Sequence, residues 1–424
     1  ILQKHGKARG ERILSELDRR LAIVPPFSRL RRFREGRGFK QWTGDDSKAL
    51  MKVYLPAIHG LVPKDVVRAI HAFLDFCYIV RRDVHSPETI AQLKDALSRF
   101  HLYREAFRVQ GVREEGFSLP RQHSMVHYEK RIWDFGAPNG LCSSITESKH
   151  IKAVKEPWRR SNRYEALGQM LLTNQRMDKL AISRVSFQSR GMLGGSYLKE
   201  AQLEIGATIP ALILELQAPS LLELIRRFLF HQIHPENQQS GSSLLLEDCP
   251  PFEQSVSVHY SAEAIFHAPS DPSGVGGMRR EFIRATPRWR KKLPRYDCVF
   301  VNRESDLPGL YGMDIARIKA FLSFRYAGKK YECALVHWYR RVGQRPDDDT
   351  GMWIVQPAFL RGGMRPYLSV IHVDTIYRAS HLIGVSKGSG LDVSQLEYHK
   401  SLDTFQRFYV NKYIDHHAFE LLHT

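Results

Sequence analysis

A single acidic residue in front of a dense basic run is the part of this sequence best suited to chemistry. Glu147 precedes six basic side chains that are opposed only by Glu156. The six are Lys149, Lys152, Lys155, Arg159, Arg160 and Arg163. A carboxylate can hold a divalent metal, and neighbouring cations can hold the phosphate backbone on which that metal acts. Taken alone, the charge pattern is also typical of a solvated helix whose acid pairs with a cation one turn away.

Longer motifs surround this run and recur elsewhere in the chain. They are Asp18–Arg20, QWTGDDSKALMKV at 41–53, FGAPNG at 135–140, SSITE at 143–147, KEPWRRS at 155–161, RYDCVFVN at 295–302, DTGMW at 349–353 and FYVNKYIDHH at 408–417. Together they closely resemble Plavaka-type fungal DNA transposases, which are relatives of the CACTA group. The resemblance covers most of the chain outside 186–290.

The resemblance implies a DDE-type, RNase H-like catalytic core that cuts and joins the ends of a transposable element, with Mg²⁺ or Mn²⁺ as cofactor. Water would be the nucleophile for cutting, and a free 3′-hydroxyl for joining. Glu147 matches the late glutamate of the family, which makes it a catalytic residue and a metal ligand. Asp46 matches an aspartate of the broader CACTA pattern and is a second catalytic candidate. A cap on the helix that starts at Ser47 is the alternative role for Asp46.

The set of acidic residues is incomplete for this chemistry. Two metal ions that clamp the attacking and leaving oxygens need several carboxylates, and the earliest catalytic aspartate of the family would lie upstream of Ile1. We therefore expect a fragment or degenerate copy, and its status as an enzyme stays uncertain. A non-catalytic DNA- or chromatin-binding protein is the main alternative, and an inactive structural remnant is a further one.

The overall charge favours a polyanionic partner. Lys and Arg number 63 against 45 Asp and Glu, which gives a formal net charge of +18. DNA is the expected partner rather than a membrane, because no apolar run approaches the roughly 18 residues needed to cross a bilayer. Five dispersed cysteines without a CxxC pair indicate a reducing compartment. Together with the resemblance, this points to the nucleus; a homo-oligomer remains open.

A second basic run surrounds a tryptophan. Glu281 is the only acid among eight cations: Arg279, Arg280, Arg284, Arg288, Arg290, Lys291, Lys292 and Arg295. Trp289 inside this run can stack on a base or wedge against a backbone. Arg288, Trp289 and Arg290 are therefore assigned to nucleic-acid binding together with the six cations around Glu147. A flexible cationic linker without a defined site is the alternative.

Hydrophobic periodicity predicts an α+β fold. Helical spacing of apolar residues follows Ser86 and Pro87, a favourable helix start. Apolar and polar residues alternate over 317–326 and 331–339, which predicts a β-hairpin. We expect a basic lead-in (1–45), a helical insertion with the late part of an RNase H-like core (46–185), a helical and linker region (186–290) and a β-rich, barrel-like module closed by a helix near 403–419 (291–424). The acidic triplet at 347–349 is expected in a solvated loop, and Asp415–His417 at a helix end.

Overall fold

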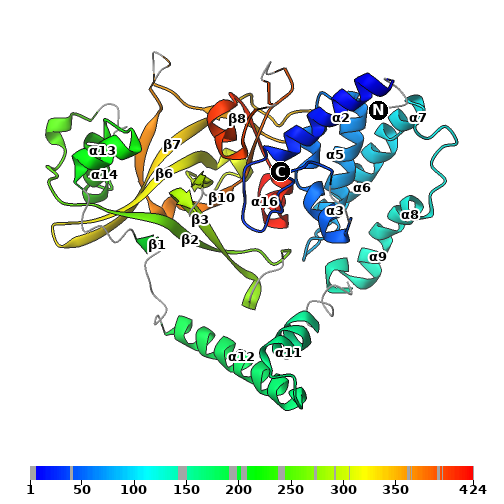
Figure 1. Ribbon diagram of the computed structural model, residues 1–424, viewed down its shortest axis with the longest axis horizontal. Coiled ribbons are helices and arrows are strands. Elements are labelled where there is room, and N and C mark those ends of the chain that lie inside the picture. The colour runs from blue at the N-terminus through cyan, green and yellow to red at the C-terminus, as the bar shows by residue number, and fades with distance from the viewer. Residues whose placement is uncertain are drawn as a thin grey trace.

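The computed structural model has a mixed α+β architecture, with a helical N-terminal half and a C-terminal part built on an antiparallel sheet (Figure 1). The last helix and the C-terminus lie between these two parts. The structure describes residues 6–38, 42–141, 150–190, 198–201, 208–236, 244–271, 275–290, 293–304, 306–360, 363, 365–388, 392–393 and 395–423.

The helical half contains a long helix at the position that the periodicity predicted. Ser86 caps α6 (Pro87–Tyr103) by accepting a hydrogen bond from the Thr89 backbone, and Pro87 occupies the first turn. Ile90, Leu93 and Phe100 then form its buried face, because they recur at helical spacing. The other helices of this half are α2 (Lys7–Ala22), α3 (Gly44–Met51), α4 (Tyr54–Ile58), α5 (Lys64–Ile79), α7 (Glu105–Val109), α8 (Pro120–His123), η1 (Ser124–His127), α9 (Tyr128–Phe135) and η2 (Pro138–Leu141).

A helical arm extends away from the body below α9 and the sheet (Figure 1). It consists of η3 (Ile151–Lys155), α11 (Glu156–Arg160) and α12 (Ala166–Ser189). The Asn174 side-chain amide donates to the Ala153 carbonyl over 2.8 Å and ties α12 to η3. Much of the arm is solvated, including apolar side chains such as Leu167, which is 70% exposed. No helix in the described part of the chain is long and apolar enough to cross a membrane.

The strands form one twelve-stranded sheet within the described residues. Their order is β11-β12-β8-β7-β6-β2-β3-β4, with β1 on β2, β5 on β6, β10 on β5 and β9 on β7. The sheet is not closed into a barrel, so the barrel-like expectation was wrong in this respect: β11 and β4 stand at opposite ends of the path. The strands are β1 (Leu198–Ala201), β2 (Ser257–His267), β3 (Met278–Trp289), β4 (Leu293–Tyr296), β5 (Cys298–Asn302), β6 (Met313–Tyr326), β7 (Lys329–Arg341), β8 (Ile354–Pro357), β9 (Leu368–His372), β10 (Ile376–Ser380), β11 (Leu382–Gly384) and β12 (Phe408–Val410).

Short helices complete this half of the molecule. Two of them, α13 and α14, pack on one face of β6, β7 and β9 through the cluster of Leu221, Phe228 and Leu335. The helices are α13 (Ile209–Leu216), α14 (Leu221–Ile233), η4 (Leu246–Asp248), η5 (Val275–Gly277), η6 (Gly309–Tyr311), η7 (Val373–Thr375), η8 (Tyr398–Lys400), α15 (Ser401–Thr404), η9 (Lys412–Ile414) and α16 (His416–Leu422).

Two features of the sheet differ from the sequence-based expectation. The β6–β7 hairpin is confirmed, but the sheet also contains β2 and β3, which lie in the segment expected to be helices and linker. Residues 403–419 do not form one helix, since they contain the end of α15, β12, η9 and the start of α16. Phe408, Tyr409 and Val410 are consecutive and all buried. A short continuous apolar run of this kind does not distinguish a buried strand from a buried helix.

The C-terminal segment joins the helical half to the sheet through buried charges. On the helical side, Lys412 Nζ lies 2.9 Å from Asp75 Oδ1, and the Tyr413 hydroxyl donates to the same oxygen over 2.7 Å. Asp75 and Lys412 are 1% and 3% exposed. Burial alone would raise the pKa of Asp75, but Lys412 holds it well below its ordinary value. This carboxylate is therefore ionised and paired inside the protein.

On the sheet side, the same segment enters a larger ionic network. Asp415 caps α16 and accepts two hydrogen bonds from Arg378, over 2.7 and 2.9 Å. Arg378 also donates to Glu281 on β3, and Arg279 of the same strand bridges Asp415 and Asp271. Each of these five residues is less than 9% exposed. Burial raises the pKa of Asp415, but Arg378 more than compensates and lowers it below its ordinary value. The Asp415–His417 motif thus starts a helix, whereas the sequence-based expectation placed it at the end of one.

A third buried cluster corrects the expectation for the acidic triplet. Asp349 is 5% exposed rather than solvated. Its carboxylate contacts His59 Nε2 at 3.2 Å, Arg68 Nε at 3.0 Å and Lys387 Nζ at 3.3 Å. The other ring nitrogen of His59 lies 2.5 Å from the Tyr409 hydroxyl. Asp349 therefore fastens the loop before β8 to the helical half.

Replacement of Asp415 by Asn should lower the free energy of unfolding by about 3–5 kcal/mol, because the buried Arg378 and Arg279 lose a charged partner. Asn keeps the helix-capping oxygen, so the change isolates the charge. Urea denaturation at pH 7 measures the effect, with Asp65→Asn as a control because Asp65 is 58% exposed. Equal stabilities of the two variants would contradict the structural role of the network.

Candidate nucleic-acid interface

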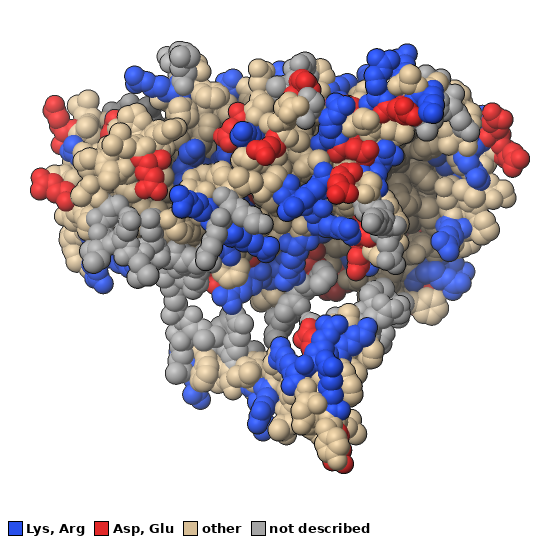
Figure 2. Space-filling view, in the orientation of Figure 1, with Lys and Arg blue, Asp and Glu red and all other residues tan. Residues whose placement is uncertain are grey.

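The basic residues assigned from the sequence fall into two groups that lie on different elements. Glu147 and Lys149 are outside the described residues, as is the side chain of Lys152. Basic side chains gather in the middle of the face shown in Figure 2 and on the arm below it. The first group of cations lies on the arm and the second at the end of β3.

The arm exposes the cations that follow Glu147. Lys155, Arg159, Arg160 and Arg163 are all exposed. Pro157 anchors the short helix α11 by its burial, and the neighbouring Trp158 is 45% exposed. These four residues are solvated, which fits both the assignment to nucleic-acid binding and the alternative of a solvated helix. Such a surface neutralises phosphates without reading a base sequence.

The structure gives Asp46 a defined structural role. Asp46 Oδ2 accepts hydrogen bonds from the Thr43 backbone over 3.0 Å and from the Thr43 hydroxyl over 2.7 Å. Thr43 in turn accepts from the Asp46 backbone, so the two form a capping box at the start of α3. The other carboxylate oxygen pairs with Arg31, and Asp46 is 2% exposed. Asp46 therefore has a capping role, but as the partner of the cap residue Thr43 in a helix that starts at Gly44, and not as the cap of a helix that starts at Ser47.

The second group surrounds Trp289 at the end of β3. Arg288 and Arg290 are exposed, and Arg290 has a left-handed backbone with φ of 51° at the turn into β4. The guanidinium carbons of Arg290 and Arg295 lie 4.7 and 4.6 Å from the centre of the Trp289 ring. Both distances are within the range of a cation–π interaction. Trp289 thus contacts two arginines at the end of a strand rather than lying in a flexible linker.

Asp297 holds one of these arginines in place. Its two carboxylate oxygens accept from Arg295 over 2.7 and 3.0 Å, and one also accepts from the Arg284 backbone over 2.9 Å. Both members of the pair are 8% exposed. A bidentate pair of this kind fixes the guanidinium plane. The orientation of the Trp289 ring therefore follows from a buried ion pair behind it.

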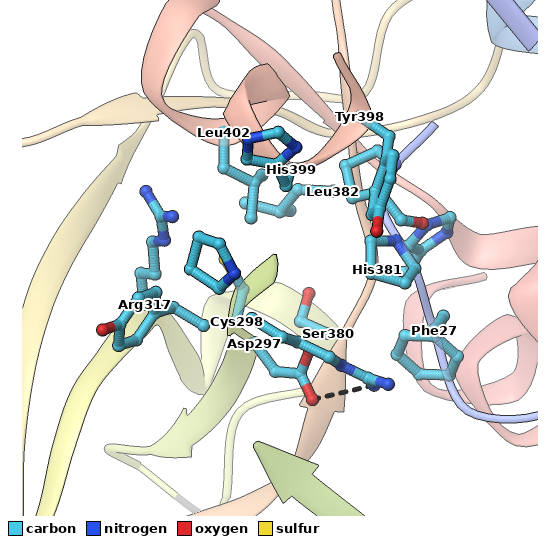
Figure 3. A pocket seen from close by; sticks show the side chains of 15 residues that line it. Phe27, Asp297, Cys298, Arg317, Ser380, His381, Leu382, Tyr398, His399 and Leu402 are labelled. Carbon is cyan, nitrogen blue, oxygen red and sulfur yellow. Dashed lines mark hydrogen bonds and ion pairs between the residues drawn. The ribbon is translucent and has the colours of Figure 1, made fainter. Parts of the chain in front are cut away.

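The pair also lines a small cavity, shown in Figure 3. Ser380, Arg317, His399, His381 and Tyr398 contribute to its wall. Ser380 Oγ, Arg317 Nε and His399 Nδ1 have no hydrogen-bond partner among the described residues. Burial raises the pKa of the Cys298 thiol in this wall to about 12, so the thiol is protonated at neutral pH and unsuited to nucleophilic chemistry.

Phe282 is a candidate interface residue that the sequence patterns did not identify. It lies on β3 between Arg280 and Arg284, with 37% of its surface exposed. The signal in the sequence was the alternation of arginine with an aromatic residue at 280, 282 and 284. That alternation places all three side chains on one face of the strand.

The described residues contain no group of three or more His, Cys, Asp and Glu side chains placed to hold a metal ion. The buried acids Asp75, Asp349 and Asp415 are paired with Lys or Arg. Comparisons of the chain with protein-family models, curated proteins and solved structures give no match. Function must therefore be inferred from the residues themselves.

Replacement of Asp46 by Ala should lower the free energy of unfolding by about 0.5–2 kcal/mol, the usual effect of losing a helix cap. Calorimetric titration with Mn²⁺ should be unchanged, because both oxygens of the carboxylate are engaged within the protein. Asp45→Ala is the matched control, since Asp45 is 94% exposed. Abolished Mn²⁺ binding at unchanged stability would instead make Asp46 a metal ligand.

Proposed function

We propose that the protein is a DNA-binding, transposase-like protein of the Plavaka type that works in the nucleus. The observation that carries this proposal is the pair of exposed arginines, Arg288 and Arg290, that flank an anchored tryptophan at the end of β3. The net charge of +18 and the solvated cations of the arm support it. Cations of this kind bind phosphates, while a fixed aromatic ring adds a contact that a diffuse charged surface lacks.

In the full form of this proposal, the segment 46–185 contains a helical insertion and the late part of an RNase H-like core. Glu147 would supply one carboxylate to a Mg²⁺ or Mn²⁺ ion, which supports cleavage by water and joining by a 3′-hydroxyl. The cations from Lys149 to Arg163 would hold the DNA backbone beside it. The sequence motifs support this part of the proposal.

A non-catalytic DNA-binding protein is the second candidate. The engagement of Asp46 in a capping box and an ion pair with Arg31 favours it, because both oxygens of one of the two acids assigned to catalysis already have partners within the protein. Both candidates share the same DNA contacts. They differ in whether Glu147 contributes to a reaction.

DNA binding should weaken steeply with salt, and the Arg288→Ala/Arg290→Ala variant should have a shallower dependence. The slope of log K against log salt should fall by about one for each phosphate that the variant no longer neutralises. Fluorescence anisotropy with a labelled duplex at several salt concentrations measures this slope. Arg108→Ala/Arg113→Ala is the control, because both residues are exposed on or next to α7, far from β3. Equal slopes for the two double variants would contradict the assignment.

Nicking of a supercoiled plasmid in Mg²⁺ or Mn²⁺ separates the two candidates. A transposase-like enzyme should nick the DNA, and Glu147→Gln should abolish nicking while duplex affinity changes by less than about 2-fold, since it removes no backbone cation. Duplex binding without nicking in the wild-type protein would leave the non-catalytic candidate. Nicking that persists in Glu147→Gln would remove Glu147 from the catalytic assignment.

A further inference from the structure

Strand β3 has two faces with opposite roles. Its side chains alternate between buried and exposed from Met278 to Ile283. The inward Arg279 and Glu281 belong to the ionic network around Arg378. The outward side chains are Arg280, Phe282 and Arg284. The inner charges therefore prevent the strand from rotating or slipping, since a shift of one residue would expose the whole network.

The outward side chains form a stack on the protein surface. The guanidinium carbons of Arg280 and Arg284 lie 5.4 and 5.0 Å from the centre of the Phe282 ring. Arg280 is also held by Glu263 on β2, which is 8% exposed and directly opposite Phe282 in the register. Phe282 is thus a partly exposed ring flanked by two arginines.

A β-bulge brings Trp289 to the same face. Thr286 pairs with Arg295 and Trp289 pairs with Leu293, so the register shifts by one residue between these two pairs. An extra residue reverses the alternation of side chains beyond it. Because Arg295 and Leu293 are two residues apart and share a face, Trp289 shares the face of Thr286, Arg284 and Phe282. Without the bulge, Trp289 would point to the opposite side.

The face therefore carries the same arrangement twice, with a ring in contact with two arginines at Phe282 and again at Trp289. The two rings are seven residues apart, but the bulge takes up one of them, so they are separated by about six steps of a strand that rises about 3.3 Å per residue, or roughly 20 Å. This distance suits an extended chain of several nucleotides better than a compact ligand. The strand therefore presents positively charged guanidinium groups and aromatic rings on the same face.

We infer that this face of β3 binds unpaired nucleotides, with bases stacked at Phe282 and Trp289 and phosphates held by the exposed arginines beside them, Arg280, Arg288 and Arg290. The inference rests on the proposed function, which identifies the polyanion as DNA. Aromatic rings and guanidinium planes stack on exposed bases. A duplex offers its phosphates but keeps its base faces covered by neighbouring pairs. Single-stranded DNA, or a melted DNA end, is therefore the ligand that can contact both the aromatic rings and the arginines of this face.

The test compares a labelled single strand of about 20 nucleotides, longer than one site of this kind usually covers, with the corresponding duplex by fluorescence anisotropy at constant salt. Phe282→Ala/Trp289→Ala should weaken single-strand binding by about 5- to 150-fold for each ring removed, while duplex binding changes by less than about 2-fold. Phe282→Tyr/Trp289→Phe should retain most of the affinity because a ring remains. Phe359→Ala is the matched control, since Phe359 is another partly exposed ring at 49%.

A second readout separates stacking from general damage to the surface. Single-stranded DNA should quench the tryptophan fluorescence of the wild-type protein, and the quenching should fall in Trp289→Phe. Equal decreases of single-strand and duplex affinity in the double alanine variant would overturn the inference. Wild-type binding to duplex but not to single strands would overturn it and leave the proposed function intact. Binding to neither DNA would remove the proposed function as well.

Discussion

The buried network around Arg378 is the interaction on which the rest of the structure depends. Arg378 is fully buried on β10 and contacts both Asp415 at the start of α16 and Glu281 on β3. A charged group at this depth is stable only when its partners are in place. The helical half joins the same segment through Asp75 and Lys412. One short stretch of the C-terminus therefore contacts both the helices and the sheet. It lies between these two parts in Figure 1.

The same network determines what the surface presents. Arg279 and Glu281 point inward because their partners are buried, and strand geometry then turns Arg280, Phe282 and Arg284 outward. Farther along the strand, the ion pair of Arg295 with Asp297 orients Trp289. The surface cations and rings are thus held by charges inside the protein. A site of this kind is organised before its ligand arrives, so less conformational freedom is lost on binding.

Local patterns in the sequence predicted those helices and strands whose formation depends on residues close together in the chain. The cap at Ser86 and the alternation over 317–326 were sufficient for α6 and the β6–β7 hairpin. Strand β3 was missed because two of its inward positions, Arg279 and Glu281, are charged, so hydropathy does not alternate along its first half. Asp349 was taken for a solvated residue because its partners Arg68 and His59 are 281 and 290 residues away. The basic residues of the arm could be identified from the sequence. The side of the strand on which Trp289 lies could not, because it depends on a β-bulge that no local pattern specifies.

The central claim is that the outward face of β3, fixed by the charges behind it, contacts the bases of unpaired DNA. Photocrosslinking with a single strand that contains 5-iodouracil, followed by mass spectrometry of the linked peptides, tests this contact directly. Crosslinks should concentrate on Phe282 and Trp289, and competition by an unlabelled single strand should remove them more effectively than competition by duplex. Crosslinks confined to the arm, with none on β3, would contradict the account.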